Sequence, residues 1–422
     1  MRDGPAAAVT VDLAPLFSAS PQDRAYDVYR ELRERAPVLQ VPGRRSWLVS
    51  RYDDVRAIVR DPDTWSSRDP EHFVSGMTEP PPPPSSRTQA ALAKGSPWVA
   101  TLLFEDGSEH RRHRASVQPA LSPARARALE DEIARIARDL VDAFPATGPV
   151  MFVRDFAGRL PNEVFAEVFG VDDADRERFI RWSANIVDLG APMEEERSVA
   201  LAEEYVEFQR YLARRIETCP AGGGDDVISH MVNGERPLTR PEFMGICALL
   251  LAAGSDPTTA TLTALLHRIV AEPGLMAAVR ADRALIPAVI DETLRLESPV
   301  AMFQRTATRD TEIRGQQIKR GEHVMVIYAS ANRDPGHWES PDEFRLGRPN
   351  IKDHLAFTQG PHNCVGAHLG RAMVRIGAEV VLDCLASIEL DGGRPLEFRP
   401  ELMTRAYREL PLIVSGRDGR AS

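Results

Sequence analysis

The sequence FTQGPHNCVG, residues 357–366, places a cysteine between turn-forming residues and a helical pattern. Gly360 and Pro361 favour a tight turn, and the apolar periodicity after Cys364 predicts a helix near 368–385. A thiol at a helix amino terminus meets the helix dipole and free backbone N–H groups, which lower its pKa and favour thiolate. Thiolate is both a nucleophile and a ligand for soft metal ions.

Several roles are open to this cysteine on the residues alone. A lone cysteine is usually buried and inert. Zinc could use His362, Cys364 and His368, but this spacing matches no common closed zinc set and lacks a nearby fourth ligand. A nucleophilic cysteine would need a distant histidine as its base. Gly360 and Gly366 would allow the backbone to approach a large or flat group closely.

The order Phe357, Gly360, His362, Cys364 and Gly366 reads F-x-x-G-x-H-x-C-x-G. This long pattern resembles the heme-binding loop of the bacterial cytochrome P450 family. The resemblance implies that Cys364 is the thiolate ligand of the iron in heme b (iron protoporphyrin IX), with the other four residues in the cofactor loop. Thiolate donation to heme iron favours O–O bond cleavage, so the resemblance implies a monooxygenase, an oxidoreductase of the EC 1.14 type.

Four further residues match the positions that bind the heme propionates in that family. His110 and Arg114 lie one helical turn apart, on one face of a predicted helix. Arg305 follows a predicted strand at 300–303, and His362 belongs to the cysteine loop. Enclosed propionates need fixed cations as partners, so the resemblance assigns these four residues to cofactor binding.

Glu292 and Arg295 form an E-x-x-R pair on one helix face. Such a pair is often an exposed ion pair of little energetic value. The resemblance implies instead a buried pair that anchors the cysteine loop together with a downstream arginine. We predict Arg333 as that third partner, with Arg348 as the alternative, and a structural role for all of them.

The longest predicted helix contains the sequence AGSDPTT, beginning at Ala253. The family usually reads A-G-x-[D/E]-T there, and its acid and threonine relay protons. Here Asp256 supplies the acid, but Pro257 replaces the threonine, which removes an N–H and predicts a kink. We therefore predict Asp256 and Thr258 as catalytic residues, with Ser255 or ordered water as alternatives to Thr258. A kink without any catalytic role for Pro257 stays open.

The resemblance also locates the substrate region. Residues 66–100 are predicted to be loop, because their five consecutive prolines cannot continue an α-helix. The resemblance makes 66–104 a flap over the pocket rather than a linker, and makes 189–193 a lid turn between two helices. An apolar lining implies an apolar or aromatic substrate. The predicted lining residues are Leu250, Ala253 (also placed beside the heme), Val300, Ala301 and Met302.

Hydrophobic periodicity predicts a fold that is mostly α with a smaller β portion. Helices are predicted at 26–32, 53–60, 109–220, 239–271 and 285–296, and strands at 38–41, 47–49, 300–303, 311–314 and 324–328. Thr239, Glu242 and Pro241 form a helix-start signature for the longest helix. The resemblance implies a cytochrome P450 fold with this long central helix over the heme. We predict a single domain over 1–422, with a β-rich lobe mainly at 36–50 and 300–330 and an α-rich lobe mainly at 109–296 and 364–386.

Composition excludes several other classes of protein. The chain has 422 residues, 43% of them hydrophobic and 27% charged, which excludes general disorder. A net charge of −10 argues against nucleic-acid binding. The four cysteines form no C-x-x-C pair, and no signal peptide or membrane anchor is visible. We expect a cytoplasmic bacterial monomer.

No flavin or iron–sulfur motif appears in the sequence. The resemblance therefore implies electrons from NAD(P)H through a separate ferredoxin and ferredoxin reductase. The basic run at 111–114 is a candidate docking patch for an acidic ferredoxin, or else an ordinary solvated helix face. We expect hydroxylation or O-dealkylation of a small molecule, with ring coupling and desaturation still open. The alternatives are a peroxide-driven heme peroxygenase, a heme sensor or carrier, and a cysteine hydrolase without heme.

Overall fold

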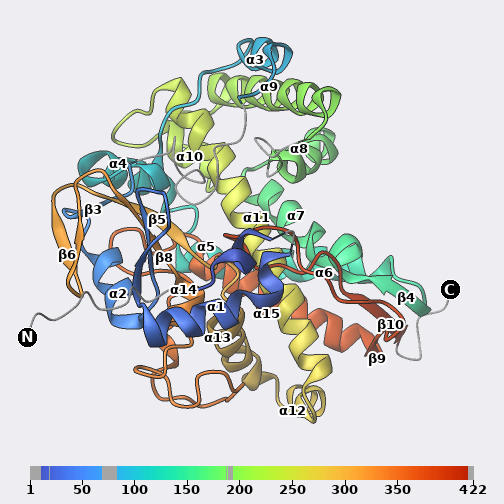
Figure 1. Cartoon of the computed structure of the whole chain (residues 1–422). Helices are drawn as coiled ribbons and strands as arrows, with labels where there is room; N and C mark the ends of the chain where they lie inside the picture. Colours follow the sequence, from blue (N-terminus) through green and yellow to red (C-terminus); the bar gives the residue numbers. More distant parts are fainter. Residues whose placement is uncertain (1–10, 19, 69–82, 187, 189–192, 417–422) are drawn as a thin grey trace, which may run out of the picture. The chain divides into compact units, whose positions relative to one another are not determined.

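The computed structural model describes residues 11–416 except 19, 69–82, 187 and 189–192 (Figure 1). The chain divides into two compact units. Unit 1 takes its residues from Met1–Pro80, Asp291–Asn363 and Glu397–Arg408, and unit 2 from Pro81–Ile290, Cys364–Leu396 and Glu409–Ser422. The prediction of a single domain stays a prediction.

Unit 1 contains a five-stranded sheet in the order β1-β2-β8-β5-β3, in which only β2 and β8 are parallel. The strands predicted at 38–41 and 47–49 are confirmed and form a hairpin, because Val38 pairs with Val49 in antiparallel register. Alternate residues enter different cores: Trp47 and Val49 join one hydrophobic cluster, and Leu48 joins another. The elements are α1 (Pro21–Arg35), β1 (Val38–Gln40), β2 (Ser46–Val49), α2 (Tyr52–Arg60), β3 (Trp65–Ser66), β5 (Phe303–Ala307), β6 (Thr311–Ile313), β7 (Gln316–Ile318), β8 (His323–Val326) and α14 (Tyr328–Ala331).

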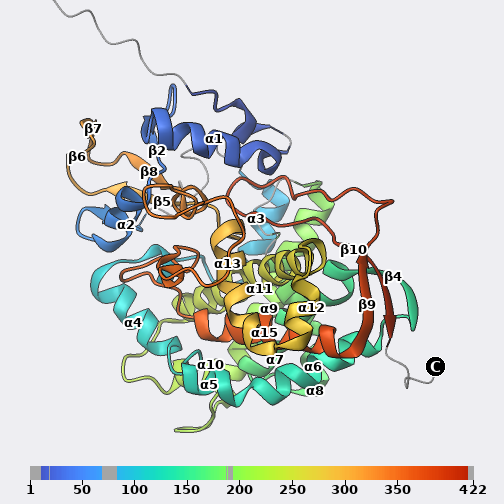
Figure 2. The ribbon, with the colours of Figure 1, turned by 90° about the horizontal axis from the view of Figure 1, so that it is seen from below.

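Unit 2 is mainly helical and carries a three-stranded antiparallel sheet in the order β4-β10-β9 (Figure 2). Helix α13 (Ile286–Glu297) crosses from unit 2 into unit 1. The other elements are α3 (Ser86–Leu92), α4 (Gly107–Val117), α5 (Pro123–Ala128), α6 (Glu130–Asp142), β4 (Thr147–Met151), a π-helical turn (Val153–Ala157), α7 (Arg159–Val168), α8 (Asp173–Ile186), α9 (Glu195–Thr218), α10 (Val227–Val232), α11 (Arg240–Ala271), α12 (Leu275–Ala281), α15 (Ala367–Cys384), β9 (Leu385–Leu390) and β10 (Pro411–Gly416).

The long helix α11 begins and ends as the sequence predicts. The Thr239 side chain accepts from the backbone N–H of Glu242, and the Glu242 carboxylate accepts from the backbone N–H of Thr239. The helix continues through Pro257 and packs against α7, α8 and α15 (Figure 1). By length and composition alone, α11 could cross a membrane, but half of its most apolar stretch is buried inside the protein.

A mostly α fold with a smaller β portion is confirmed, but three local predictions were wrong. The stretch 66–100, predicted to be loop, contains α3, and the helical span 109–220 contains β4. Strand β4 exists because β10, far along the chain, pairs with it. The strand predicted at 300–303 begins only at Phe303, since the backbone of Ala301 bonds to Met403 outside the sheet.

Candidate functional site

Cys364 lies just before helix α15, which begins at Ala367 with Gly366 as its N-cap. The cysteine is accessible on one side, although protein atoms crowd its sulfur on the others. This burial raises the pKa of the Cys364 thiol, and the Gly366 N–H and the Arg114 and Arg371 charges only partly offset it. The prediction that the helix terminus lowers the pKa was therefore wrong in its net effect, because desolvation outweighs these groups.

The space beside the cysteine suits close approach by a large group. A Cβ added at Gly366 would meet nothing within 4 Å. In contrast, a Cβ at Gly360 would lie 2.5 Å from the backbone oxygen of Val59, and Gly360 has a φ of +74°. Gly360 is thus required by the turn itself, for conformation and for packing, whereas Gly366 leaves room next to the sulfur.

Helix α4 in unit 2 carries His110 and Arg114 one turn apart, as predicted. His110 is buried, with 4% of its surface exposed. Arg114 is half-buried, and burial lowers the pKa of its guanidinium while the nearby Cys364 raises it. The structure therefore brings Arg114 within electrostatic range of Cys364.

Unit 1 supplies the remaining predicted loop and cation residues. Arg305 is buried on β5, donates to the carbonyl of Gln304 over 2.7 Å and lies over the Phe303 ring. The Nε2 atom of His362 lies 3.1 Å from the hydroxyl of Ser67. Phe357, the last of the set, is half-buried.

The E-x-x-R pair is fully buried and forms two parallel bonds of 2.8 Å between Arg295 and Glu292. Arg348 adds a bond of 2.9 Å to the same carboxylate, so the runner-up is the third partner. The prediction of Arg333 was wrong, because its guanidinium donates to the Leu296 carbonyl and covers the Tyr26 ring. Burial alone would raise the pKa of Glu292, but its arginine partners and the Arg345 N–H lower it.

The turn around Pro257 places the hydroxyls and the acid of α11 on different sides. The Thr258 hydroxyl donates to the carbonyl of Gly254 over 2.7 Å. Ser255 donates to the side chain of Asn162 on α7 over 2.8 Å, so it does not replace the missing threonine. Asp256 is half-buried, and Ala253 is exposed although it lies on an otherwise well-buried helix.

The predicted pocket residues differ in accessibility. Ala301 and Met302 are fully covered by the hydrophobic core of unit 1, so the structure does not support them as lining residues. Leu250 is 6% exposed, whereas Val300 is partly buried against the sheet core. Ala253 and Val300 therefore remain the accessible members of the predicted set.

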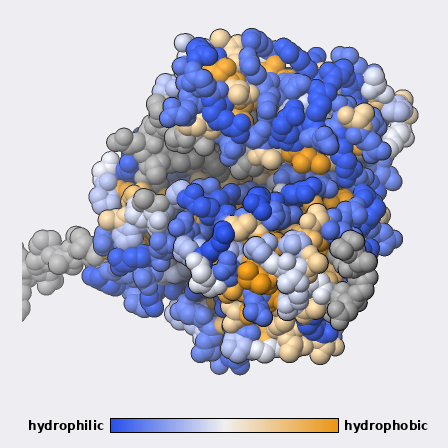
Figure 3. Space-filling model, turned by 90° about the vertical axis from the view of Figure 1, so that its right-hand side faces the viewer, coloured by the Kyte–Doolittle hydropathy of each residue, from blue (hydrophilic) through white to orange (hydrophobic). Residues whose placement is uncertain are grey.

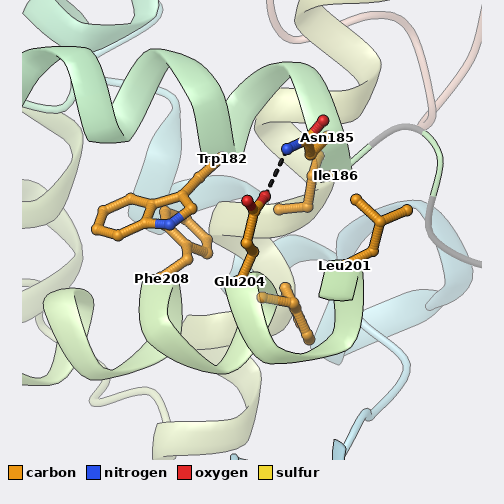
Figure 4. Close-up of a pocket in the computed structure, with 7 residues that line it drawn as sticks. Trp182, Asn185, Ile186, Leu201, Glu204 and Phe208 are labelled. Atoms are coloured by element: carbon orange, nitrogen blue, oxygen red, sulfur yellow. Dashed lines mark hydrogen bonds between the residues drawn. The ribbon is translucent and has the colours of Figure 1, made fainter. Parts of the chain in front are cut away.

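A small crevice lies between α8 and α9 in unit 2 (Figure 4). Its space measures about 190 Å³, part of it open to solvent. Glu204 accepts from Asn185 over 2.5 Å at its edge, and Trp182 forms one wall. None of the predicted site residues lines it.

On the face shown in Figure 3, hydrophobic residues form small separate groups in a mainly hydrophilic surface.

The basic run at 111–114 is not an open basic patch. Arg112 pairs with Glu109 and Glu242, and His113 is buried against Glu242. These acids and His113 lie close enough to hold a metal ion. However, the Leu102 N–H donates to His113 Nδ1, so Nε2 carries the proton and faces Glu242 as a donor. With Arg112 already between the carboxylates, we assign no metal there.

The predicted lid turn at 189–193 and the five prolines lie mostly outside the described residues. In the described part of the predicted flap, Arg87 of α3 pairs with Glu195 and Glu196 of α9. Trp98 is 59% exposed, more than any other large hydrophobic residue in the described part of the chain.

Comparison with known proteins gives consistent matches. The family model for cytochrome P450 matches residues 193–389. Mycinamicin IV hydroxylase/epoxidase of Micromonospora griseorubida is 33% identical, over 91% of this chain and 94% of that protein. A cytochrome P450 of Bacillus subtilis is 30% identical, over 94% and 96%. The solved structure of a cytochrome P450 from Chondromyces apiculatus superposes with a TM-score of 0.81, at 28% identity, over 95% and 98%.

Proposed function

Because this chain belongs to the bacterial cytochrome P450 family of heme-dependent monooxygenases, we propose that Cys364 is the thiolate ligand of its heme iron. One observation carries this proposal: Cys364 is accessible at the start of α15, with the Gly366 N–H on its sulfur and Arg114 in electrostatic range. Gly366 leaves space beside the sulfur for a flat group. When bound, heme supplies the activation of dioxygen for insertion of one oxygen atom into substrate.

The donor set fits a heme with two carboxylates at its edge. We assign the propionates to His110 and Arg114 of unit 2 and to Arg305 and His362 of unit 1. Arg305 is buried and Arg114 is half-buried, and a guanidinium held away from water pairs favourably with an enclosed carboxylate. Phe357 would pack beside the cofactor loop.

Asp256 is the residue we assign to proton delivery. It stands next to Pro257, which provides neither an N–H nor a hydroxyl. The hydrogen of the Thr258 hydroxyl is directed to Gly254, so Thr258 has only lone pairs with which to hold a water. Asp256 is thus the acid–base group of the relay, and the lone pairs of Thr258 can orient a water molecule in it.

The substrate is assigned as a small apolar or aromatic molecule, oxidised by hydroxylation or O-dealkylation. Accessible Ala253 and Val300 would give a small apolar lining, to which Leu250, about one turn before Ala253 on α11, would add. The name of the Micromonospora relative, a hydroxylase/epoxidase, is consistent with oxygen insertion. Screening small molecules for a low-to-high-spin shift of the ferric protein would identify the class, and a set of apolar and aromatic compounds that gives no shift would contradict it.

Electrons are proposed to come from NAD(P)H through a separate ferredoxin and its reductase, in a cytoplasmic, monomeric enzyme. The peroxide-driven alternative predicts equal or faster turnover with hydrogen peroxide. Comparing the two systems at equal heme concentration separates them.

The test of the ligand assignment is Cys364→Ser. We expect the reduced carbon monoxide complex to lose its red-shifted difference band, because a hydroxyl donates far less charge than a thiolate. Cys384→Ser, at the last residue of α15, is the control and should keep the band. An unchanged band in Cys364→Ser, or a colourless wild-type protein after growth with iron and porphyrin precursor, would contradict the proposal.

A further inference from the structure

Pro257 leaves helix α11 locally weak. Its ring nitrogen cannot donate to the Ala253 carbonyl, so one rung of the helix is missing. Beyond it, hydroxyls donate to the carbonyl four residues earlier, a pattern that bends helices. These bonds are Thr258 to Gly254, Thr259 to Ser255, Thr261 to Pro257 and Thr263 to Thr259. The turn must therefore be held from outside the helix.

Asn162 on α7 provides such a hold. Its Oδ1 atom accepts from the Ser255 hydroxyl of α11 over 2.8 Å and from the Ser183 hydroxyl of α8 over 2.6 Å. Its Nδ2 atom donates to the carbonyl of Gly158 over 2.7 Å, which fixes the orientation of the amide. All three side chains are at least nine-tenths buried. A satisfied buried network of this kind makes the arrangement rigid.

Two neighbouring contacts fix the same turn. Phe165, one turn after Asn162 on α7, packs so closely on Gly254 that an added Cβ would lie 2.1 Å from its ring. The Thr259 hydroxyl lies 3.0 Å from the carbonyl of Ala157, the last residue of the π-helical turn before α7. The segment before α7 and α7 itself therefore contact α11 both before and after Pro257 in the sequence.

The contacts from α7 and the segment before it reach a different face of α11 from the one that carries Ala253 and Pro257. At roughly 100° per residue, Ala253 and Pro257 point about 160° away from Ser255, and Asp256 points about 100° to its side. Thr259 returns to within roughly 40° of Ser255. Asn162 therefore acts on Asp256 through the backbone of α11.

We propose that Asn162 is a positioning residue that holds the Pro257 turn so that Asp256 stays aligned for proton delivery. This inference rests on the proposed function. Because Ser183 and Ser255 share one acceptor oxygen, Asn162 also ties α8 to α11 at this turn. Pro257 makes the hydrogen bonds of Asn162 necessary, since a helix with all its backbone bonds would keep its own geometry.

The test uses the holoenzyme with Asn162→Ala and a surrogate ferredoxin system. We expect hydrogen–deuterium exchange of the amides at 254–256 and 258 to rise at least about tenfold, because the bonds from outside the helix are lost. We expect hydrogen peroxide released per NAD(P)H to rise a few-fold, with heme content and the carbon monoxide band unchanged. In a Pro257→Ala background, which restores the N–H, the exchange effect of Asn162→Ala should fall to less than half.

Ser255→Ala is the second variant, because it keeps the contacts of Asn162 with Ser183 and Gly158. It should move both readouts in the same direction as Asn162→Ala. Thr263→Ala is the matched control: it removes a buried α11 hydroxyl that bonds only within its own helix, and both readouts should stay at the wild-type level.

Two results would overturn the inference. One is exchange within twofold of Thr263→Ala in both test variants. The other is faster exchange without extra peroxide, which is the behaviour of a purely structural contact. If the protein binds no heme, the proposed function fails, and wild-type exchange in Asn162→Ala would separately refute the positioning role of Asn162.

Discussion

The Glu292 network and the Glu242 cluster combine the same side-chain types in two different environments. Glu292, Arg295 and Arg348 expose at most 3% of their side chains. Glu242 and Arg112 expose 17% and 16%, and Glu109 exposes 43%. Both groups contain an E-x-x-R pair in the sequence. Removing a partner of Glu292 leaves a charge in the protein interior, whereas water can replace a lost partner of the more exposed Glu242 cluster.

The largest effect that tests this comparison is expected for Arg348→Ala. Removing Arg348 leaves Glu292 buried with fewer partners, which should lower the free energy of unfolding by about 3–5 kcal/mol. Urea unfolding followed by far-ultraviolet circular dichroism measures it. Arg333→Ala is the control, because Arg333 does not touch Glu292, and it should cost about 1 kcal/mol. Equal losses in the two variants would refute the assignment of Arg348.

A smaller, pH-dependent effect is expected for Glu242→Gln. Burial alone would raise the pKa of Glu242, but hydrogen bonds from Arg112, Thr239 and His113 outweigh it and lower the pKa to about 2. Because the folded pKa lies below the unfolded value of 4.5, this carboxylate stabilises the fold above pH 4.5 and the contribution is lost as pH falls toward 2. Glu242→Gln should thus cost on the order of 2 kcal/mol at pH 7.

The measurement for Glu242 is the difference in urea midpoint between wild type and variant at several pH values. The difference should shrink between about pH 5 and pH 3. Glu109→Gln, at the exposed edge of the same cluster, is the control and should change little at any pH. A difference that stays constant with pH would contradict the lowered pKa of Glu242.

The smallest effect is expected at Arg111, the exposed residue of the basic run. Arg111→Glu should slow reduction by an acidic ferredoxin a few-fold at low salt and leave unfolding unchanged, because its charge acts through solvent. Stopped-flow reduction at two salt concentrations measures it. Arg112→Glu should in addition destabilise the fold, since it breaks the contacts with Glu109 and Glu242. Reduction rates in Arg111→Glu equal to wild type at every salt concentration would exclude α4 as part of the docking surface.

Local signals predicted the elements whose own residues determine them. The capping residues Thr239 and Glu242 predicted the start of α11, and the β-like runs at 38–41 and 47–49 predicted the two strands of the hairpin. Strand β4 was missed because its partner β10 lies about 260 residues away in the chain. The third partner of the Glu292–Arg295 pair was misassigned to Arg333. Arg295 does reach this segment, but it donates to the backbone carbonyl of Asn332, and the Arg333 side chain donates to the Leu296 carbonyl instead.

The order of residues around Cys364 was enough to predict the family and the kind of cofactor, because that chemistry depends on donor type and spacing within one short segment. Only the tertiary structure decided which charges are buried, which hydroxyls are already engaged and how the pKa of Cys364 shifts. These properties depend on desolvation and on partners brought together from distant segments. Asn162 shows this most clearly: nothing in its local sequence marks it, and its bonds with Ser183 of α8 and Ser255 of α11 exist only in the folded chain.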